Sequence, residues 1–148
     1  MTDSRPERTE AQPSRQIFVN LPVKDLARST DFFAQLGFLF DPQSAGEDTR
    51  RMILSTDASV MLHAERYFKE FTNSEVADTS RSREVVVGLS AVSREQVDDM
   101  ARKAVAAGGR SLGEAVDQGF MYMRAFRDLD GHQWSVLYLD LSAIPGQR

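Results

Sequence analysis

Cysteine is missing from all 148 residues of the chain, and histidine occurs only twice. The lack of cysteine excludes disulfides, thiolate metal sites and a cysteine nucleophile. It suits a cytoplasmic protein, and we expect the protein to be cytoplasmic. The longest apolar runs also fall well short of the about 20 residues that cross a bilayer, so we expect no membrane partner.

Basic residues are outnumbered as well, because 18 Lys and Arg stand against 22 Asp and Glu. No basic stripe with interleaved aromatic residues occurs, so we expect no nucleic-acid partner. With 41% hydrophobic and 27% charged residues, the composition is that of one globular domain. Residues 1–15 are polar, contain two prolines and lack the apolar stretch of a signal peptide. We expect them to form a disordered arm before a single domain of residues 16–140.

The first half of this domain begins with strand and helix signals. Residues 17–23 carry the β-branched and aromatic side chains that are typical of a strand. Asp25 can cap a following helix that ends at Gly37. Three short strands are then predicted at residues 38–40, 51–55 and 59–63.

The same order returns after residue 83. Residues 84–92 predict a strand, and Ser93 to Gln96 fit a capping box that starts a helix, which ends at Gly108-Gly109. Strands follow around residues 110–112, 120–127 and 132–139. The sequence therefore predicts two βαβββ modules at about 16–64 and 84–140, a linker at 65–83 with a short helix, and a C-terminal tail at 141–148. Each module leaves one apolar sheet face that must be covered, with the helices on the outside.

Two stretches carry a resemblance to a known family. Val19 to Leu26, followed by Ser29, Phe32-Phe33 and Leu36-Gly37-Phe38, looks like the opening of vicinal oxygen chelate proteins. Phe126 to His132 is similar to their closing strand–turn–strand, with Leu129 in place of the usual proline. Over residues 17–140 the chain thus resembles the glyoxalase/bleomycin-resistance/dioxygenase (vicinal oxygen chelate) superfamily, nearest to a branch often labelled "predicted lactoylglutathione lyase". The resemblance implies an α+β fold whose two modules form a curled mixed or antiparallel sheet around a cleft. It also implies a homodimer, with modules that pair within or between chains.

The same resemblance implies a divalent metal held by histidine and glutamate. Alignment on the two motifs places Phe18, Met61, Val86 and Ser135 at the metal-ligand positions. Phenylalanine and valine offer no lone pair, and a thioether or a neutral hydroxyl is a poor ligand for such metals. We therefore predict no metal at the family site and no cofactor.

Side-chain alternation along strands predicts which residues line the cleft. The predicted ligand-binding cleft contains Phe18, Asn20, Met61, His63, Val86, Tyr122, Arg124 and Ser135. Arg124 would bind a carboxylate or phosphate if its strand face points inward, and would pair with a surface acid otherwise. If Tyr122 and Arg124 face the cleft, Met121 and Met123 take the opposite face and are interpreted as core fillers. His63 is the one candidate general base, although a surface position is the plainer interpretation of a lone histidine.

Two hypotheses follow. The first is a metal-free binding protein that holds a small, partly apolar or anionic molecule, similar in logic to bleomycin-binding relatives. The alternative is a glyoxalase-like lyase or dioxygenase with a non-standard metal or acid/base site. The sequence leaves open whether the protein is an enzyme, and it does not identify the ligand.

Overall fold

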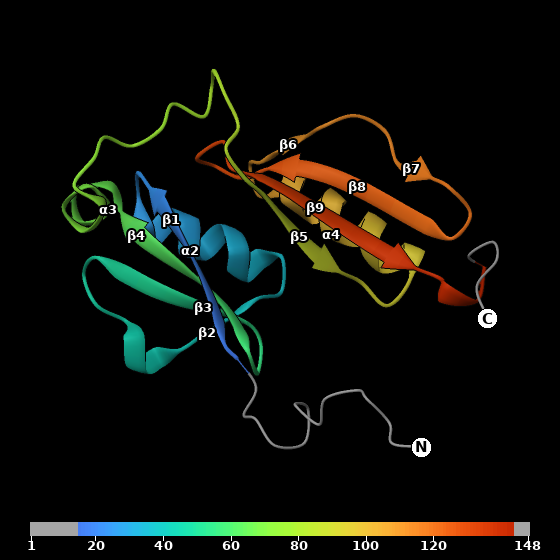
Figure 1. Ribbon diagram of the computed structural model, residues 1–148, viewed down its shortest axis with the longest axis horizontal. Coiled ribbons are helices and arrows are strands. Elements are labelled where there is room, and N and C mark those ends of the chain that lie inside the picture. Colours follow the sequence, from blue (N-terminus) through green and yellow to red (C-terminus); the bar gives the residue numbers. More distant parts are fainter. Residues whose placement is uncertain (1–14, 144–148) are drawn as a thin grey trace, which may run out of the picture.

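The computed structural model describes residues 15–143, and Figure 1 shows two modules lying side by side. The first module contains β1 (Ile17–Val23), α2 (Leu26–Gln35), β2 (Leu39–Phe40), β3 (Thr49–Ser55) and β4 (Ala58–Ala64). The second contains β5 (Val86–Ser90), α4 (Arg94–Ala106), β6 (Arg110–Ser111), β7 (Val116–Asp117), β8 (Met121–Arg127) and β9 (Gln133–Leu139). Between the modules in chain order comes α3 (Glu65–Thr72), and short 3₁₀ turns occur at Pro42–Ser44 and Leu141–Ala143.

The two long helices begin and end where the sequence predicts. The Asp25 carboxylate accepts a hydrogen bond from the Arg28 N–H at 3.2 Å and caps α2. Ser93 Oγ accepts from the Gln96 N–H at 3.0 Å and caps α4. The Gln96 side chain reaches back as a capping box requires, but it accepts from the N–H of Val92, one residue before the cap. After α2, Gly37 adopts a positive φ of 101°, which glycine tolerates without strain.

Each module forms its own sheet, and four strands of each sheet share the same connectivity. The first sheet has the order β1-β4-β3-β2, and the second has the order β5-β9-β8-β6, with β7 also paired to β8. In both sheets the first strand of the module runs parallel to the last, and the other pairs are antiparallel. The predicted α+β class with two βαβββ modules is confirmed. The strands form two sheets of mixed orientation rather than one continuous curled sheet in the described part of the chain.

Aromatic side chains join the two modules into one core. Phe33 of α2 lies 5.0 Å from Trp134 of β9, measured between ring centroids, and Phe32 lies 6.4 Å from Phe126 of β8. All four side chains are at most 1% exposed. The helices α2 and α4 lie on the same side of the two sheets (Figure 1). Phe32, Phe33 and Trp134 therefore belong to one core between the helices and the sheets.

The expected N-terminal arm, apart from Arg15, and residues 144–148 of the expected tail lie outside the described residues. Between residues 15 and 143, no helix combines the length and the apolar character that a membrane crossing requires.

Candidate functional site

The first sheet has one face against the helices and one open face. Its helix-side residues, such as Met52, Val60 and Leu62, are completely buried. The strand register then assigns the alternate residues to the open face: Phe18, Asn20 and Pro22 of β1, Ser59, Met61 and His63 of β4, and Thr49, Arg51 and Ile53 of β3. The structure thus places four predicted cleft residues, Phe18, Asn20, Met61 and His63, on one surface.

The second sheet has a corresponding open face. The register places these residues on it: Val86, Gly88 and Ser90 of β5, Gln133, Ser135 and Leu137 of β9, and Met121, Met123, Ala125 and Arg127 of β8. Val86 and Ser135 therefore share a face, as alternation predicts. The interpretation of Met121 and Met123 as core fillers is wrong. Phe126 is the buried residue of β8, and strand alternation places Met121 and Met123 on the face opposite to it.

Tyr122 and Arg124 do not belong to this surface, which corrects the predicted cleft. Both point toward α4, where the Tyr122 hydroxyl and Arg124 Nε each donate to Asp98 Oδ1 at 2.7 Å. The hydrogen bonds from Tyr122 and Arg124 lower the pKa of Asp98. In addition, the Arg94 guanidinium lies 4.9 Å from the Tyr122 ring centroid. These residues fasten α4 to the second sheet, and Arg124 pairs with an acid as the alternative interpretation held.

His63 occupies a covered position at the end of the first open face. It is 6% exposed, because the aromatic residues of α3 lie over it. The ring centroids of Tyr67, Phe68 and Phe71 are 5.4, 6.2 and 5.6 Å from the His63 ring. The helical spacing of these aromatics is visible in the sequence, but nothing in it identifies His63 as the residue that they cover.

Both ring nitrogens of His63 have hydrogen-bond partners. The Asn20 amide oxygen, 2.7 Å from Nε2, can only accept, so Nε2 carries the hydrogen. Nδ1 then accepts from the Thr49 hydroxyl at 2.9 Å. Burial lowers the pKa of His63, which favours this neutral tautomer. The arrangement fixes the ring in place, and His63 can take up a proton at Nδ1 only by reversing the hydrogen bond from Thr49.

We expect His63 to make stability depend on pH in one direction. Its pKa in the folded protein lies below the value of about 6.5 for an unfolded chain. The unfolded state therefore binds more protons, and stability is lost as pH falls through about 6.5 toward the folded pKa, by at most about 1.4 kcal/mol per pH unit. Urea unfolding at pH 7.5, 6.0 and 5.0 measures this loss. In His63→Gln the loss should be smaller, and identical pH dependence in both proteins would contradict the assignment.

The residues at the positions that the resemblance assigns to metal ligands do not fit a divalent cation. Phe18 and Met61 lie on the first open face, and Val86 and Ser135 lie on the second. They supply two hydrocarbons, a thioether and a hydroxyl, none of which is a good ligand for such an ion. Across residues 15–143, no three His, Asp or Glu side chains gather as a metal-ligand set.

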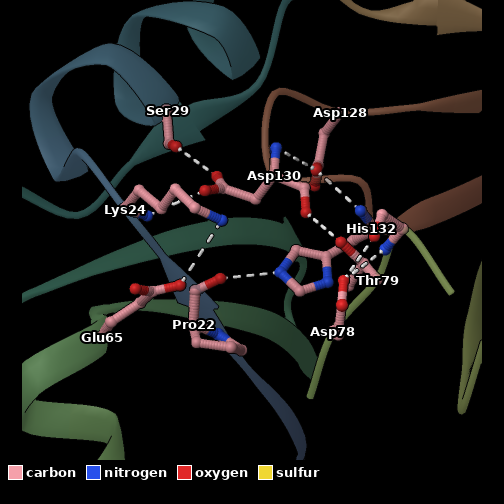
Figure 2. A network of polar contacts seen from close by, with 10 residues as sticks. Pro22, Lys24, Ser29, Glu65, Asp78, Thr79, Asp128, Asp130 and His132 are labelled. Carbon is pink, nitrogen blue, oxygen red and sulfur yellow. Dashed lines mark hydrogen bonds and ion pairs between the residues drawn. The ribbon is translucent and has the colours of Figure 1, made fainter. Parts of the chain in front are cut away.

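A polar network fastens the β8–β9 turn to the first module (Figure 2). The Asp130 carboxylate accepts from the Lys24 N–H at 2.8 Å and from the Ser29 hydroxyl at 3.0 Å. His132 Nε2 donates to the Pro22 carbonyl at 2.7 Å, and the Thr79 hydroxyl donates to the Asp130 carbonyl at 2.7 Å. His132, the second histidine of the chain, thus has a structural role. In the sequence this segment shows only a turn.

The sequence of the chain matches a known protein family. The family model described as Glyoxalase/Bleomycin resistance protein/Dioxygenase superfamily matches residues 15–136. No curated protein matches the chain.

Solved structures share the fold at low sequence identity. A hypothetical protein from S. aureus is 24% identical with a TM-score of 0.74, covering 89% of this chain and 99% of its own. A glyoxalase/bleomycin resistance protein/dioxygenase family enzyme from Burkholderia phytofirmans PsJN is 15% identical with a TM-score of 0.73, covering 85% and 99%. A glyoxalase-related enzyme from Fulvimarina pelagi is 18% identical with a TM-score of 0.71, covering 88% and 90%.

Proposed function

Since the chain belongs to the Glyoxalase/Bleomycin resistance protein/Dioxygenase superfamily, we propose that it is a metal-free small-molecule-binding protein whose ligand lies against the open sheet faces. One observation carries this proposal. Phe18, Met61, Val86 and Ser135 occupy the open faces where a metal enzyme of this superfamily would need imidazoles and carboxylates. These positions offer a metal only a thioether and a hydroxyl, both poor ligands, whereas the surface itself remains available for binding.

The chemistry of the open faces suits a partly apolar ligand. Phe18 of the first sheet is 47% exposed and Val86 of the second is 48% exposed, and exposed apolar side chains favour burial against an apolar partner. Polar groups lie among them. Arg51 donates from Nε to Ser59 Oγ at 3.0 Å and pairs with Asp41 at 3.5 Å, and its guanidinium lies 5.7 Å from the Phe18 ring centroid. A ligand with an apolar body and a polar or anionic group would satisfy both kinds of side chain.

A second copy of the chain is the proposed cover for these faces. A layered α+β module is stable when both faces of its sheet are covered. Here α2 and α4 cover one face of each sheet, whereas α3 covers only the His63 end of the first open face. Because the two modules share one topology, the first open face of one copy can lie over the second open face of another. A two-fold axis repeats this contact and closes the assembly as a homodimer. The ligand would then lie between the paired faces.

Mass and metal content of one purified sample test the proposal. We expect a particle of twice the 16.6 kDa chain mass by light scattering, with metal well below one ion per chain by plasma mass spectrometry. Stoichiometric metal, together with isomerisation of a methylglyoxal–glutathione hemithioacetal that a chelator abolishes, would instead establish the lyase alternative.

Two charge-insertion variants serve as matched controls for the dimer. Phe18→Glu places a carboxylate on the open face and should give a folded monomer. Val105→Glu, at a position of α4 that is 49% exposed, should remain a dimer. Equal effects of the two substitutions on the oligomeric state, or a monomeric parent protein, would contradict the proposed dimer.

A further inference from the structure

Three arginines gather at one end of the second sheet. Arg110 of β6 and Arg127 of β8 are direct partners across the antiparallel ladder. The register continues this row from Arg127 to Gln133 and on to Val86. Arg83 precedes β5 by three residues at the same end of the sheet. Like charges that face one another across a ladder are destabilising, so the row needs a compensating charge.

Carboxylates of the described residues do not supply that charge. No ion pair joins Arg83, Arg110 or Arg127 to any of them. Arg83 donates to the backbone carbonyls of Thr79 and Ser82. Arg127 Nε is buried and has no hydrogen-bond partner between residues 15 and 143. A buried donor without an acceptor costs free energy, and the cost is greater for a charged group.

Glu84 follows Arg83 and lines the same cavity, but no ion pair joins it to the three arginines. The two acids that follow Arg127 are already engaged. Asp128 accepts from the N–H groups of Asp130 and His132 and from the Trp134 indole. Asp130 accepts from Lys24 and Ser29 of the first module. Burial lowers the pKa of Arg127, and the positive charges of Arg83 and Arg110 lower it further. The local field therefore favours an added anion.

We infer that Arg83, Arg110 and Arg127 form a binding site for a phosphate group. Arg110 and Arg127 line a depression together with Lys24 and Thr79. Asp128 and Asp130 also line it, with their carboxylates engaged in the hydrogen bonds given above. Arg83 lines the adjoining cavity, which shares Thr79 with the first. Guanidinium groups bind phosphate oxygens in pairs of parallel hydrogen bonds, and a phosphate supplies enough oxygens for several donors at once.

The site goes beyond the proposed function, because a phosphate needs no contact with the rest of the open face. Arg127 nevertheless lies in the same row as Val86. A phosphate monoester with an apolar group could therefore place its phosphate on the arginines and its apolar part on the open face. Comparing the affinities for inorganic phosphate and phenyl phosphate distinguishes a site for free phosphate from a site for a phosphate monoester.

The test is calorimetric titration of the full-length protein with sodium phosphate, at pH 7.5 and in sodium chloride of matched ionic strength. We expect saturable binding of phosphate that Arg127→Gln weakens by about tenfold or more, because charged hydrogen bonds are lost. Arg110→Gln is a second variant at an exposed position and should also weaken binding. Arg102→Gln removes the same charge from α4, where the side chain is 69% exposed and pairs with Asp99. Its affinity for phosphate should match that of the parent protein.

Thermal unfolding separates a ligand site from a purely structural role. Without phosphate, Arg127→Gln should melt at the same temperature as the parent or higher, since it removes an unpaired charge. With phosphate, only the parent and Arg102→Gln should gain stability. Absence of saturable binding, or equal weakening by Arg102→Gln, would overturn the inference. Tighter binding of phenyl phosphate would extend the site onto the open face, and equal affinity would limit it to the phosphate.

Discussion

Replacing Asp128 with alanine is expected to lower the free energy of unfolding by about 3–5 kcal/mol, because several buried donors lose their acceptor together. Asp128 is 5% exposed. Its carboxylate accepts from the Asp130 N–H at 2.9 Å, the His132 N–H at 3.0 Å and Trp134 Nε1 at 2.9 Å. Burial raises the pKa of Asp128, so these three hydrogen bonds offset part of the cost of placing a carboxylate there.

Urea unfolding measures the loss, and Trp134 is the only tryptophan of the chain, so its fluorescence reports from the altered site. Asp128→Asn keeps one acceptor oxygen and should lose less. Asp78 is a matched control, since it accepts from the N–H two residues ahead, on Ser80, as Asp128 does from Asp130. Asp78 is exposed, so Asp78→Ala should cost about 1 kcal/mol or less. Similar losses at the two positions would show that burial of the donors is not the cause.

Phe33→Ala should also destabilise the protein, by about 3–5 kcal/mol. Phe33 is 1% exposed and lies between Phe32 at 4.9 Å, Phe38 at 6.1 Å and Trp134 at 5.0 Å, measured between ring centroids. The substitution removes a full aromatic ring at the junction of the two modules and leaves a cavity there.

The same variant tests whether the modules unfold together. Circular dichroism reports both modules, and Trp134 fluorescence reports the second, so coincident shifts of the two transitions indicate one cooperative unit. Phe71→Ala, at a position of α3 that is 57% exposed, is the control and should cost about 1 kcal/mol or less. An unchanged fluorescence transition in Phe33→Ala would mean that the second module is stable without the first.

The order of helices and strands can be predicted from the sequence because capping residues and glycines indicate where the helices begin and end. Asp25 and Ser93 cap the two long helices, and Gly37 and Gly108 follow their ends with positive φ. These are local signals that act within a few residues. The prediction of two βαβββ modules rests on them, and the structure confirms it.

The sequence does not predict in the same way which face of β8 points toward α4. Both of its faces carry side chains that suit either environment, with Met121 and Met123 on one and Tyr122 and Arg124 on the other. The deciding partner is Asp98, which lies 24 residues before Tyr122 and 26 before Arg124. The cover that α3 forms over His63 depends in the same way on packing between segments rather than on any local pattern.

The aromatic junction between the modules also has a consequence for how the chain is made. During synthesis Phe32 and Phe33 leave the ribosome about a hundred residues before Trp134, the partner that helps to bury them. Within each module the first strand likewise waits for the last, because these two pair in parallel. The nascent first half therefore exposes an apolar surface until Trp134 has emerged, and chaperone binding should be strongest in that interval.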